Sequence, residues 1–464
     1  MLPRTLIVQF VLSFSKGQKS GKLSFVDGQL RATIEEKVVE GTLRPVPTFT
    51  RRDVRIPAVP NKAFAIIGMR RAGKTTFLWQ IVQEHLLHGM PREYALYFNF
   101  EDERLLDLQA RDLHLIVETY YQLYPHTRDR ERVLFLLDEI QRVSGWETFV
   151  RRLLDSETVA VFLSGSSARM LAYELGTSMR GRALPVVVFP FSFREYLRHL
   201  GEAPDRAFAH LRKAQRSQIQ ARLRQYLHEG GFPEAVGLEA VDRRELLMSY
   251  VDGVILRDVV ERYQVSNVSV LRRLVRHLLS NPGAVFSVNK FYNDLRSQGV
   301  SVSKDTLHTL LGHLEDAFLI RTVPFFAYSQ AQQRVHPRKV YPIDTGFIPF
   351  YTAPRPFPVG HALETCVLLE LLRRKMEVSY LRTASGYEVD FVAFSPDGAV
   401  LLIQACADLS DSATHAREVR ALLDAAAQFP NASLHIITLE TTPPPDAHPA
   451  IHYHNAAAWL LGES

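Results

Sequence analysis

Runs of apolar residues divide the first 190 positions of the chain into strands and connecting segments. Continuous apolar runs, typical of strands buried on both faces, lie within 63–67, 94–102, 132–141, 159–167 and 184–190. An amphipathic helix follows the first run. This pattern predicts an open α/β sheet with a site at the carboxyl ends of its strands.

The middle of the chain changes to short helical patterns. The segment "SVNKFYNDLRSQG" predicts a helix that ends at a glycine, and "SVSKDTLHTLLGHLEDAFLI" predicts a second helix with a serine cap. A strand, "LIRTVPFF", then leads to a wing with Arg334, Arg338 and Lys339. This order is typical of a winged helix.

The last third predicts a second α/β unit, whereas the first 45 residues have a weaker pattern. A helix over 360–375 precedes three strands within 378–406, with a Pro-Asp-Gly turn at 396–398. Near the start, "KLSFVDGQLRATIEEKVVEGTL" predicts short alternating strands around Asp27 and Gly28, in an added or poorly ordered arm.

Composition narrows the class of protein. A chain of 464 residues predicts two to four domains, and 46% hydrophobic with 23% charged residues is typical of a globular protein. Two cysteines exclude a disulfide framework, and no apolar run is long enough to span a bilayer. The start resembles a signal peptide only faintly, so an N-terminal strand and a cytoplasmic location without a membrane partner are expected.

The net charge of +5 is unevenly distributed. Residues 1–265 carry +6, residues 266–339 carry ten basic and four acidic residues, and residues 340–464 carry seven basic and fourteen acidic residues. An electrostatic grip on nucleic acid is therefore expected in the first two-thirds of the chain.

The strongest chemical signal follows the first strand, where a Gly-x-x-x-x-Gly-Lys-Thr pattern begins at residue 68. Its glycines let backbone N–H groups converge on phosphate oxygens, its lysine reaches the β- and γ-phosphates, and its threonine ligates Mg²⁺. The predicted ATP-binding residues are Gly68, Arg70, Arg71, Ala72, Gly73, Lys74, Thr75 and Thr76.

Two later strands predict the rest of a hydrolytic site. Asp138 at the end of "RVLFLLDEIQ" would hold Mg²⁺ with Thr75, and Glu139 would polarise the attacking water. In "VAVFLSGSS", Ser164 or Ser166 could sense the γ-phosphate or simply cap the next helix; Ser166 is our candidate.

ATP hydrolysis usually requires an arginine that neutralises the negative charge developing on the γ-phosphate. Arg180 and Arg182 follow the third strand, and Arg182 is the candidate, in its own chain or a neighbouring subunit. Surface arginines are abundant, so an ordinary surface role for any one of them remains open.

These motifs, with "YFNFEDERL", "RGRALPVVVFPFSFREYL", "EGGFPEAV" and "LRDVVERY", resemble bacterial and archaeal AAA-type ATPases that carry an uncharacterised C-terminal domain. The resemblance runs from about residue 50 to about 410. It implies an AAA-type ATPase core over 46–190, a helical lid over 191–265, a winged helix over 266–340 and a restriction-endonuclease-like domain over 341–464; residues 1–45 do not match it.

In the nuclease pattern, Glu364 and Asp390 would be metal ligands, and the third strand would add an acid, one residue and a lysine. Here those positions hold Gln404, Ala405 and Cys406, and no lysine follows Lys375. We therefore expect an inactive nuclease fold. Glu388 and Asp390 could persist for structural reasons, such as pairing with Arg382.

Three functions are compatible with these features. The first is an ATPase coupled to DNA binding or remodelling, without sequence-specific reading and including branched or structured DNA. The second is a nucleotide-switched signalling or scaffold ATPase with a protein partner, and the third is an ATP-regulated nuclease. A homo-oligomer is compatible with each of them.

Overall fold

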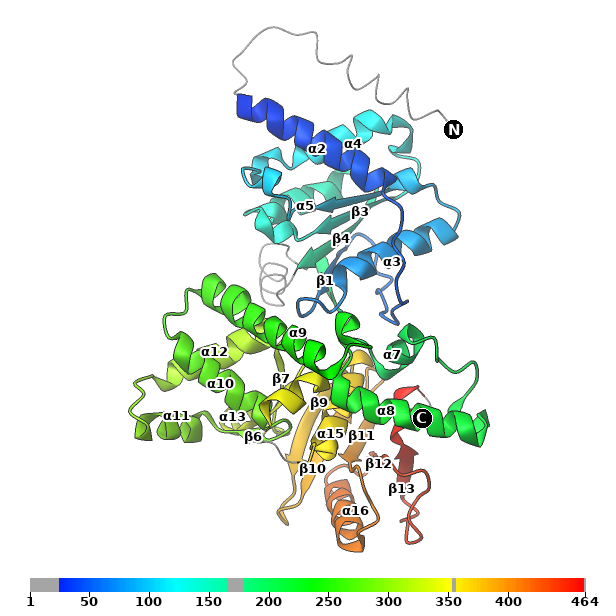
Figure 1. Ribbon diagram of the computed structural model, residues 1–464, viewed down its shortest axis with the longest axis vertical. Coiled ribbons are helices and arrows are strands. Elements are labelled where there is room, and N and C mark those ends of the chain that lie inside the picture. The colour runs from blue at the N-terminus through cyan, green and yellow to red at the C-terminus, as the bar shows by residue number, and fades with distance from the viewer. Residues whose placement is uncertain (1–24, 166–178, 180, 353–355, 463–464) are drawn as a thin grey trace.

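The structure is a computed structural model that describes residues 25–165, 179, 181–352 and 356–462. Figure 1 shows two lobes. Of the described residues, the upper lobe contains 25 to about 187, and the lower lobe contains those that follow. The loop between the first strand and its helix lies at the bottom of the upper lobe, so it faces the lower lobe.

A parallel sheet forms the centre of the upper lobe and confirms the predicted open α/β arrangement. Its strands lie in the order β2-β3-β4-β1-β5. They are β1 (Ala63–Ile67), β2 (Ala95–Asn99), β3 (Val133–Asp138), β4 (Val159–Gly165) and β5 (Ala183–Val187). The helices of this lobe that follow strands are α3 (Lys74–Leu87), α4 (His114–Leu123) and α5 (Trp146–Ser156).

The N-terminal arm corrects one prediction, because α2 (Phe25–Leu43) is a helix and not a pair of strands. Ile34 and Val38 are fully buried, and a spacing of four residues places them on one helical face. This face lies against α4 and β2. The arm therefore belongs to the upper lobe.

The helices that follow β5 are the first elements of the lower lobe. They are α7 (Phe193–His199), α8 (Lys213–Glu229), α9 (Ala240–Gly253) and a π-helix (Val254–Glu261). Apolar residues of α7 and α8, such as Tyr196 and Leu227, share a buried cluster with Leu363 and Trp459 near the C-terminus. These two helices therefore pack on the last part of the chain.

The next module contains three helices and a small antiparallel sheet. Its helices are α10 (Val268–Ser280), α11 (Val288–Ser297) and α12 (Lys304–Asp316). Its strands are β6 (Val285–Phe286), β7 (Ile320–Val323) and β8 (Arg338–Pro342), in the order β6-β8-β7. Short helices α13 (Gln330–Val335) and α14 (Ile348–Tyr351) flank β8.

A second five-stranded sheet occupies the bottom of the lower lobe, where Figure 1 draws it in yellow to red. Its order is β13-β12-β11-β10-β9. The strands are β9 (Glu377–Arg382), β10 (Glu388–Phe394), β11 (Val400–Ala405), β12 (Ser433–Thr438) and β13 (Ile451–Asn455). The helices are α15 (Val359–Arg373), α16 (Ser412–Ala426) and α17 (Ala456–Leu460).

The small sheet is joined to this second sheet through the segment after β7. The Phe326 amide donates to the Tyr380 carbonyl at 2.7 Å, and the Tyr380 amide donates to the Pro324 carbonyl at 2.9 Å. Tyr380 lies on β9, so the segment covers the edge of the larger sheet. The segment after β7, for which a wing was predicted, is therefore docked on β9.

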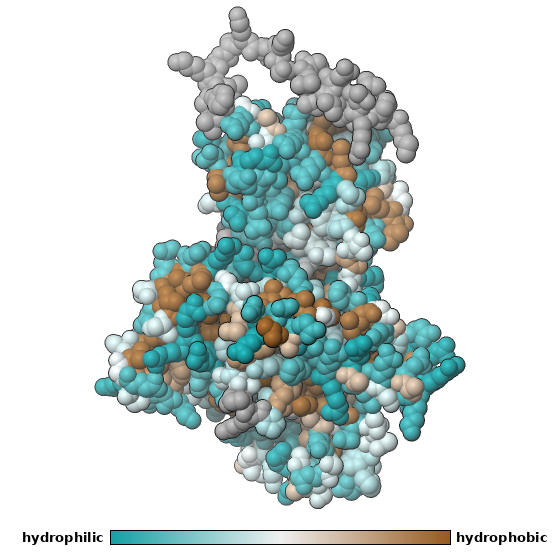
Figure 2. All heavy atoms as spheres, viewed as in Figure 1, coloured by the Kyte–Doolittle hydropathy of each residue, from teal (hydrophilic) through white to brown (hydrophobic). Residues whose placement is uncertain are grey.

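Figure 2 shows polar residues over both lobes, with hydrophobic residues in separate groups between them on this face. Within the described ranges, no helix combines the length and apolar character required to cross a bilayer.

Candidate nucleotide-binding site

The loop between β1 and α3 has a backbone that its glycines permit. Gly68 has φ 153° and Gly73 has φ 97°. A Cβ at Gly68 would overlap the carbonyl oxygen of Val188, and a Cβ at Gly73 would lie 3.0 Å from the Arg52 guanidinium. The loop therefore curves tightly over the end of β1, with the N-terminus of α3 directed at the space above it.

Lys74, the first residue of α3, is buried beneath this loop. Its Nζ donates to the carbonyls of Gly68 at 3.1 Å and Met69 at 3.0 Å. Burial lowers the pKa of Lys74, although Glu139 and Asp138 oppose that shift. The lysine is thus held where phosphate oxygens would meet the loop.

Asp138 at the end of β3 collects hydroxyl groups from three other elements. Its carboxylate accepts hydrogen bonds from Thr75 at 2.9 Å, from Tyr97 at 2.7 Å and from Ser164. Strand β4, which carries Ser164, lies between β3 and β1. The sheet order therefore places this serine between the aspartate and the phosphate-binding loop.

Glu139 follows Asp138 with a left-handed backbone, φ 56°. Its amide donates to Ser164 Oγ at 3.2 Å, and its carboxylate accepts from Gln141. Burial raises the pKa of Glu139, and the nearby Lys74 opposes that rise. A carboxylate with a raised pKa is suited to accept a proton from water.

The oxygen ligands around Asp138 fit Mg²⁺. Thr75 and Asp138 offer two hard oxygen donors side by side, and Mg²⁺ usually takes one or two protein oxygens plus water and phosphate. The described part of the chain holds no cluster of three or more acidic, His or Cys residues able to bind a metal. This donor set therefore suits an ion that arrives with a nucleotide.

Two arginines of the loop contact the lower lobe. Arg70 Nε lies 3.0 and 2.9 Å from the two carboxylate oxygens of Asp258, and Arg71 lies 3.2 Å from Glu234. Asp258 belongs to the π-helix and is 3% exposed, so burial raises its pKa although Arg70 opposes the rise. The loop is therefore tied to elements almost 190 residues away in the sequence.

A third arginine braces the loop from below. Arg52 is 3% exposed, donates to the Ala72 carbonyl at 2.8 Å and lies 3.1 Å from Glu195 on α7. Its guanidinium also donates to the Phe189 carbonyl. Thr76, the last predicted contact residue, lies partly exposed in the first turn of α3.

The structure does not bring Arg182 to this group, and Ser166 and Arg180 lie outside the described residues. Arg182 precedes β5, whereas the loop follows β1, and these strands run parallel. At about 3.3 Å per residue, a strand of this length separates Arg182 from the loop by roughly 16 Å. Arg182 instead pairs with Asp155 on α5.

Tyr97, Asp258 and Arg52 join the site without having been predicted for it. Tyr97 could have been predicted from the sequence, because a tyrosine with a polar hydroxyl stands out on a buried apolar strand. That strand, β2, lies next to β3. Asp258 and Arg52 reach the loop only through packing of distant elements. A sequence pattern around 68–76 contains no trace of them.

A second polar cluster lies at the C-terminal sheet and corrects the sequence analysis. Lys339 on β8 lies 2.8 Å from Glu388 and 3.0 Å from both Glu364 and Asp390. It is 2% exposed, so it is not a free wing residue. The carboxylates of Glu364, Glu388 and Asp390 therefore share a lysine that comes from upstream of Lys375.

The ammonium of Lys339 occupies the centre of this cluster. Its pKa is raised because the three carboxylates outweigh the opposing effect of burial. Burial and the charge of Glu364 raise the pKa of Asp390 to about 7. Gln404 accepts from the Asp390 amide at 2.7 Å and donates to Glu418 at 2.7 Å, so it fixes the strand that carries Asp390.

Comparison with known proteins identifies two regions of the chain. Residues 60–197 match the family described as an AAA domain, and residues 220–352 match a domain of unknown function. Among solved structures, the Walker-type ATPase of Pyrococcus abyssi is similar at 14% identity, over 72% of this chain and 98% of that chain, with a TM-score of 0.35.

Two relatives are similar over most of their length. An uncharacterised protein of Methanocaldococcus jannaschii, MJ1544, is 32% identical over 83% of this chain and 84% of that protein. An uncharacterised protein of Haemophilus influenzae is 28% identical over 75% of this chain and 83% of that protein.

Proposed function

The chain belongs to the same family as the uncharacterised MJ1544 protein of M. jannaschii and carries an AAA domain, and on this premise we propose that it is a Mg²⁺-dependent ATP hydrolase. The observation that carries the proposal is the Asp138 carboxylate. It joins Thr75 of the phosphate-binding loop to Ser164 of β4, directly beside Glu139.

Each residue of the group has a role in this proposal. Lys74 and the loop amides would bind the β- and γ-phosphates, and Thr75 and Asp138 would hold Mg²⁺. When bound, Mg²⁺ would neutralise charge on the phosphate oxygens. Glu139 would accept a proton from the attacking water, and its raised pKa favours that role over one of a permanently ionised carboxylate.

Two substitutions separate nucleotide binding from turnover. We expect Lys74→Ala to abolish ATP binding, because the buried ammonium contacts the phosphates. We expect Glu139→Gln to retain binding and to lower turnover by about 10² or more, because an amide cannot take the proton. Calorimetric binding of ATP and release of phosphate measure the two effects.

Glu131→Gln is the matched control, because Glu131 is an exposed acid on the same lobe. Its turnover should equal that of the wild type. Retained turnover in both Lys74→Ala and Glu139→Gln would exclude this site as the seat of hydrolysis.

We further propose that the lower lobe reads the nucleotide through Arg70. Asp258 holds this arginine by two contacts, and incoming phosphate would compete for the same guanidinium. A buried Asp258 that loses its cation is costly, so the π-helix is expected to move when Arg70 turns to phosphate.

The partner of this movement is proposed to be DNA, gripped by a winged helix over 266–340 without sequence-specific contacts. The support is the net charge of this segment and the N-terminus of α12, where Ser303 and Lys304 are exposed and Thr306 is half-buried. Lys339 must be subtracted from that charge, since it is paired internally. Stimulation of ATP hydrolysis by duplex, single-stranded or branched DNA tests the coupling.

A protein partner is the second candidate, and the docked wing favours it. The segment after β7 covers β9 through Phe326 and Tyr380 and is not free to enter a DNA groove. If no form of DNA binds or stimulates hydrolysis at moderate salt, the scaffold function is the better one. Arg182 stays a proposal as a residue supplied to a neighbouring subunit.

A further inference from the structure

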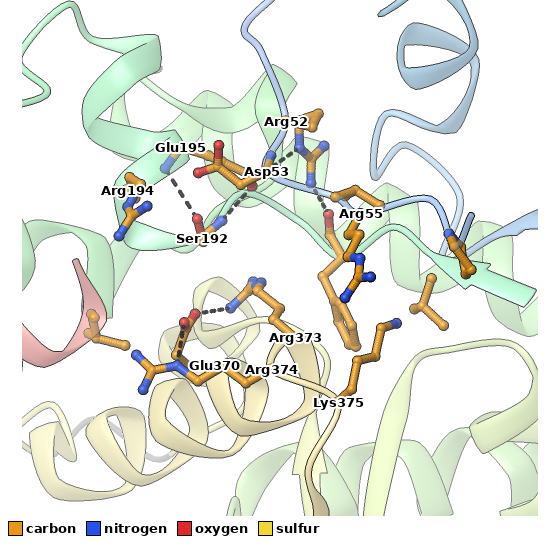
Figure 3. Close-up of a pocket in the computed structure, with 15 residues that line it drawn as sticks. Arg52, Asp53, Arg55, Ser192, Arg194, Glu195, Glu370, Arg373, Arg374 and Lys375 are labelled. Atoms are coloured by element: carbon orange, nitrogen blue, oxygen red, sulfur yellow. Dashed lines mark hydrogen bonds and ion pairs between the residues drawn. The ribbon is translucent and has the colours of Figure 1, made fainter. Parts of the chain in front are cut away.

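A cleft at the junction of the two lobes lies apart from residues 68–76 of the nucleotide site. It has a volume of about 560 Å³, and it lies between the segment that precedes β1, the start of α7 and the C-terminal end of α15. Figure 3 shows its walls, with Arg52, Asp53 and Arg55 above and Glu370 to Lys375 below. Among the described residues, none of 68–76 lines it.

Basic residues outnumber acidic ones in this cleft by six to three. The basic residues are Arg52, Arg55, Arg194, Arg373, Arg374 and Lys375. The acidic residues are Asp53, Glu195 and Glu370. Residues 340–464 contain only seven basic residues, and three of them are consecutive at 373–375 in this wall. The acidic part of the chain therefore concentrates its positive charge here.

Most of these cations are held by the fold. Arg373 donates to the Pro190 carbonyl at 3.0 Å, and Arg374 lies 3.0 Å from Glu370. Within the part of the chain that the structure describes, Arg55 and Lys375 have no ion pair. Figure 3 shows them extending into the cleft from opposite walls, so two uncommitted positive charges face one space.

The backbone at Lys375 gives an independent indication. Lys375 follows α15 with φ 62°, in the left-handed position that usually holds glycine after a helix. Its amide donates to the Leu372 carbonyl at 3.1 Å, as in a glycine-terminated helix end. A lysine kept in a conformation that costs it stability points to a use for its charge.

The rest of the wall is apolar, with Val54, Pro57, Val187, Phe189 and Leu460. A cleft of this size, with an apolar wall and a few convergent charges, is typical of a small-molecule site. We propose that it binds a phosphate-bearing small molecule of mononucleotide size, with the phosphate on Arg55 and Lys375 and the organic part against the apolar wall.

This site is distinct from the phosphate-binding loop but connected to it. Arg52 stands between them, with contacts to the Ala72 carbonyl on one side and to Glu195 on the other. Glu195 also accepts from the Asp53 amide at 2.7 Å in the cleft wall. A molecule bound in the cleft could therefore shift Arg52 and, through it, the backbone of the loop at Ala72.

Titration calorimetry on the full chain carrying Lys74→Ala tests the proposal with two probes, AMP and inorganic pyrophosphate. The background removes the loop lysine, so binding in the cleft is measured alone. We expect one AMP per chain. Lys375→Gly or Arg55→Ala, added to this background, should weaken binding about tenfold or more, because each removes a charge-assisted contact.

Lys375→Gly also separates function from folding, since glycine suits the left-handed position. Its melting temperature should equal or exceed that of the parent while ligand binding falls. Arg216→Ala, an exposed arginine on α8, is the control and should bind like the parent. No saturable binding of either probe at millimolar concentration, or binding unaffected by both cleft substitutions, overturns the site and leaves the hydrolase proposal untouched.

Discussion

At the scale of single residues, the candidate site is organised by hydroxyl groups around one aspartate. Ser164 donates to the Asp138 carboxylate and accepts from the Glu139 amide, so one side chain contacts both the first acid and the backbone of the second. We propose that this residue acts by positioning its two neighbours.

We expect Ser164→Ala to lower turnover 10- to 100-fold with little loss of ATP binding, because the groups that contact phosphate stay in place. Phosphate release and calorimetric ATP affinity measure the two effects. Ser156→Ala, an exposed serine at the end of α5, should leave both unchanged. A large loss of affinity in Ser164→Ala would show that the hydroxyl binds nucleotide itself.

The sequence predicts part of this arrangement well. Lys74 and Thr75 are consecutive residues, and Asp138 ends a strand that must lie in the same sheet. Their proximity therefore follows from local pattern and strand polarity. The position of Arg182 could not be predicted in this way. Arg182 precedes β5, which runs parallel to β1, so it lies at the end of the sheet opposite to the loop. Only the pairing of β5 with β1 shows this.

At the scale of elements, α2 determines how β2 presents Tyr97 to the site. Gly41 in the last turn of α2 lies against the Tyr97 carbonyl so closely that a Cβ would overlap it. Arg92 donates to the Gly41 carbonyl at 2.7 Å, and Lys37 lies 2.9 Å from Asp102. Helix α2 therefore contacts the chain before β2, within β2 and in the loop that follows β2.

The same substitution at two glycines of α2 should have opposite effects. We expect Gly41→Ala to lower the free energy of unfolding by about 1–3 kcal/mol, because the strand must shift. Gly28→Ala should raise it by about 0.5–1 kcal/mol, since no atom lies within 4 Å of its Cβ and alanine favours a helix. Denaturant unfolding measures the free energy of unfolding of both variants. Equal changes in the two variants would contradict the close packing of Gly41 on the Tyr97 carbonyl.

The helix itself was predicted wrongly for a physical reason. Glycines at 28 and 41 and β-branched residues such as Val38 favour strands and turns over helices in an isolated peptide. Burial of Ile34 and Val38 against the upper lobe outweighs those propensities. That burial depends on residues more than 50 positions away, so no local pattern reports it.

At the scale of the whole molecule, Lys339 couples two sheets. It belongs to β8 of the small sheet, and its three carboxylates lie on α15 and β10. The nuclease pattern places its lysine on the strand after Asp390, and no lysine follows Lys375 in this chain. Nothing in the spacing of residues 339 and 390 indicates that their side chains meet.

We expect Lys339→Met to lower the free energy of unfolding by about 3 kcal/mol or more at neutral pH, because buried carboxylates lose their counter-ion. Arg338→Met is the matched control, since this neighbour is exposed and should change stability by less than about 0.5 kcal/mol. If both variants lost the same free energy of unfolding, the cluster around Lys339 would not stabilise the fold more than an exposed residue does.

The raised pKa of Asp390 predicts a pH dependence. Its folded pKa of about 7 exceeds the ordinary value of 3.8, so its contribution to stability is complete below about pH 4 and is lost as pH rises through 7. Relative to Asp390→Asn, the wild type should lose about 2 kcal/mol between pH 5 and pH 7. Parallel unfolding curves across this range would contradict the assignment.

The position of Lys339 also bears on how such proteins can evolve. A gene fusion or deletion at about residue 340 would separate one buried cation from three acids, and each product would inherit an uncompensated charge. The C-terminal sheet and the small sheet must therefore be inherited, lost or exchanged together. The boundary that the sequence draws between them is a poor place to cut the gene.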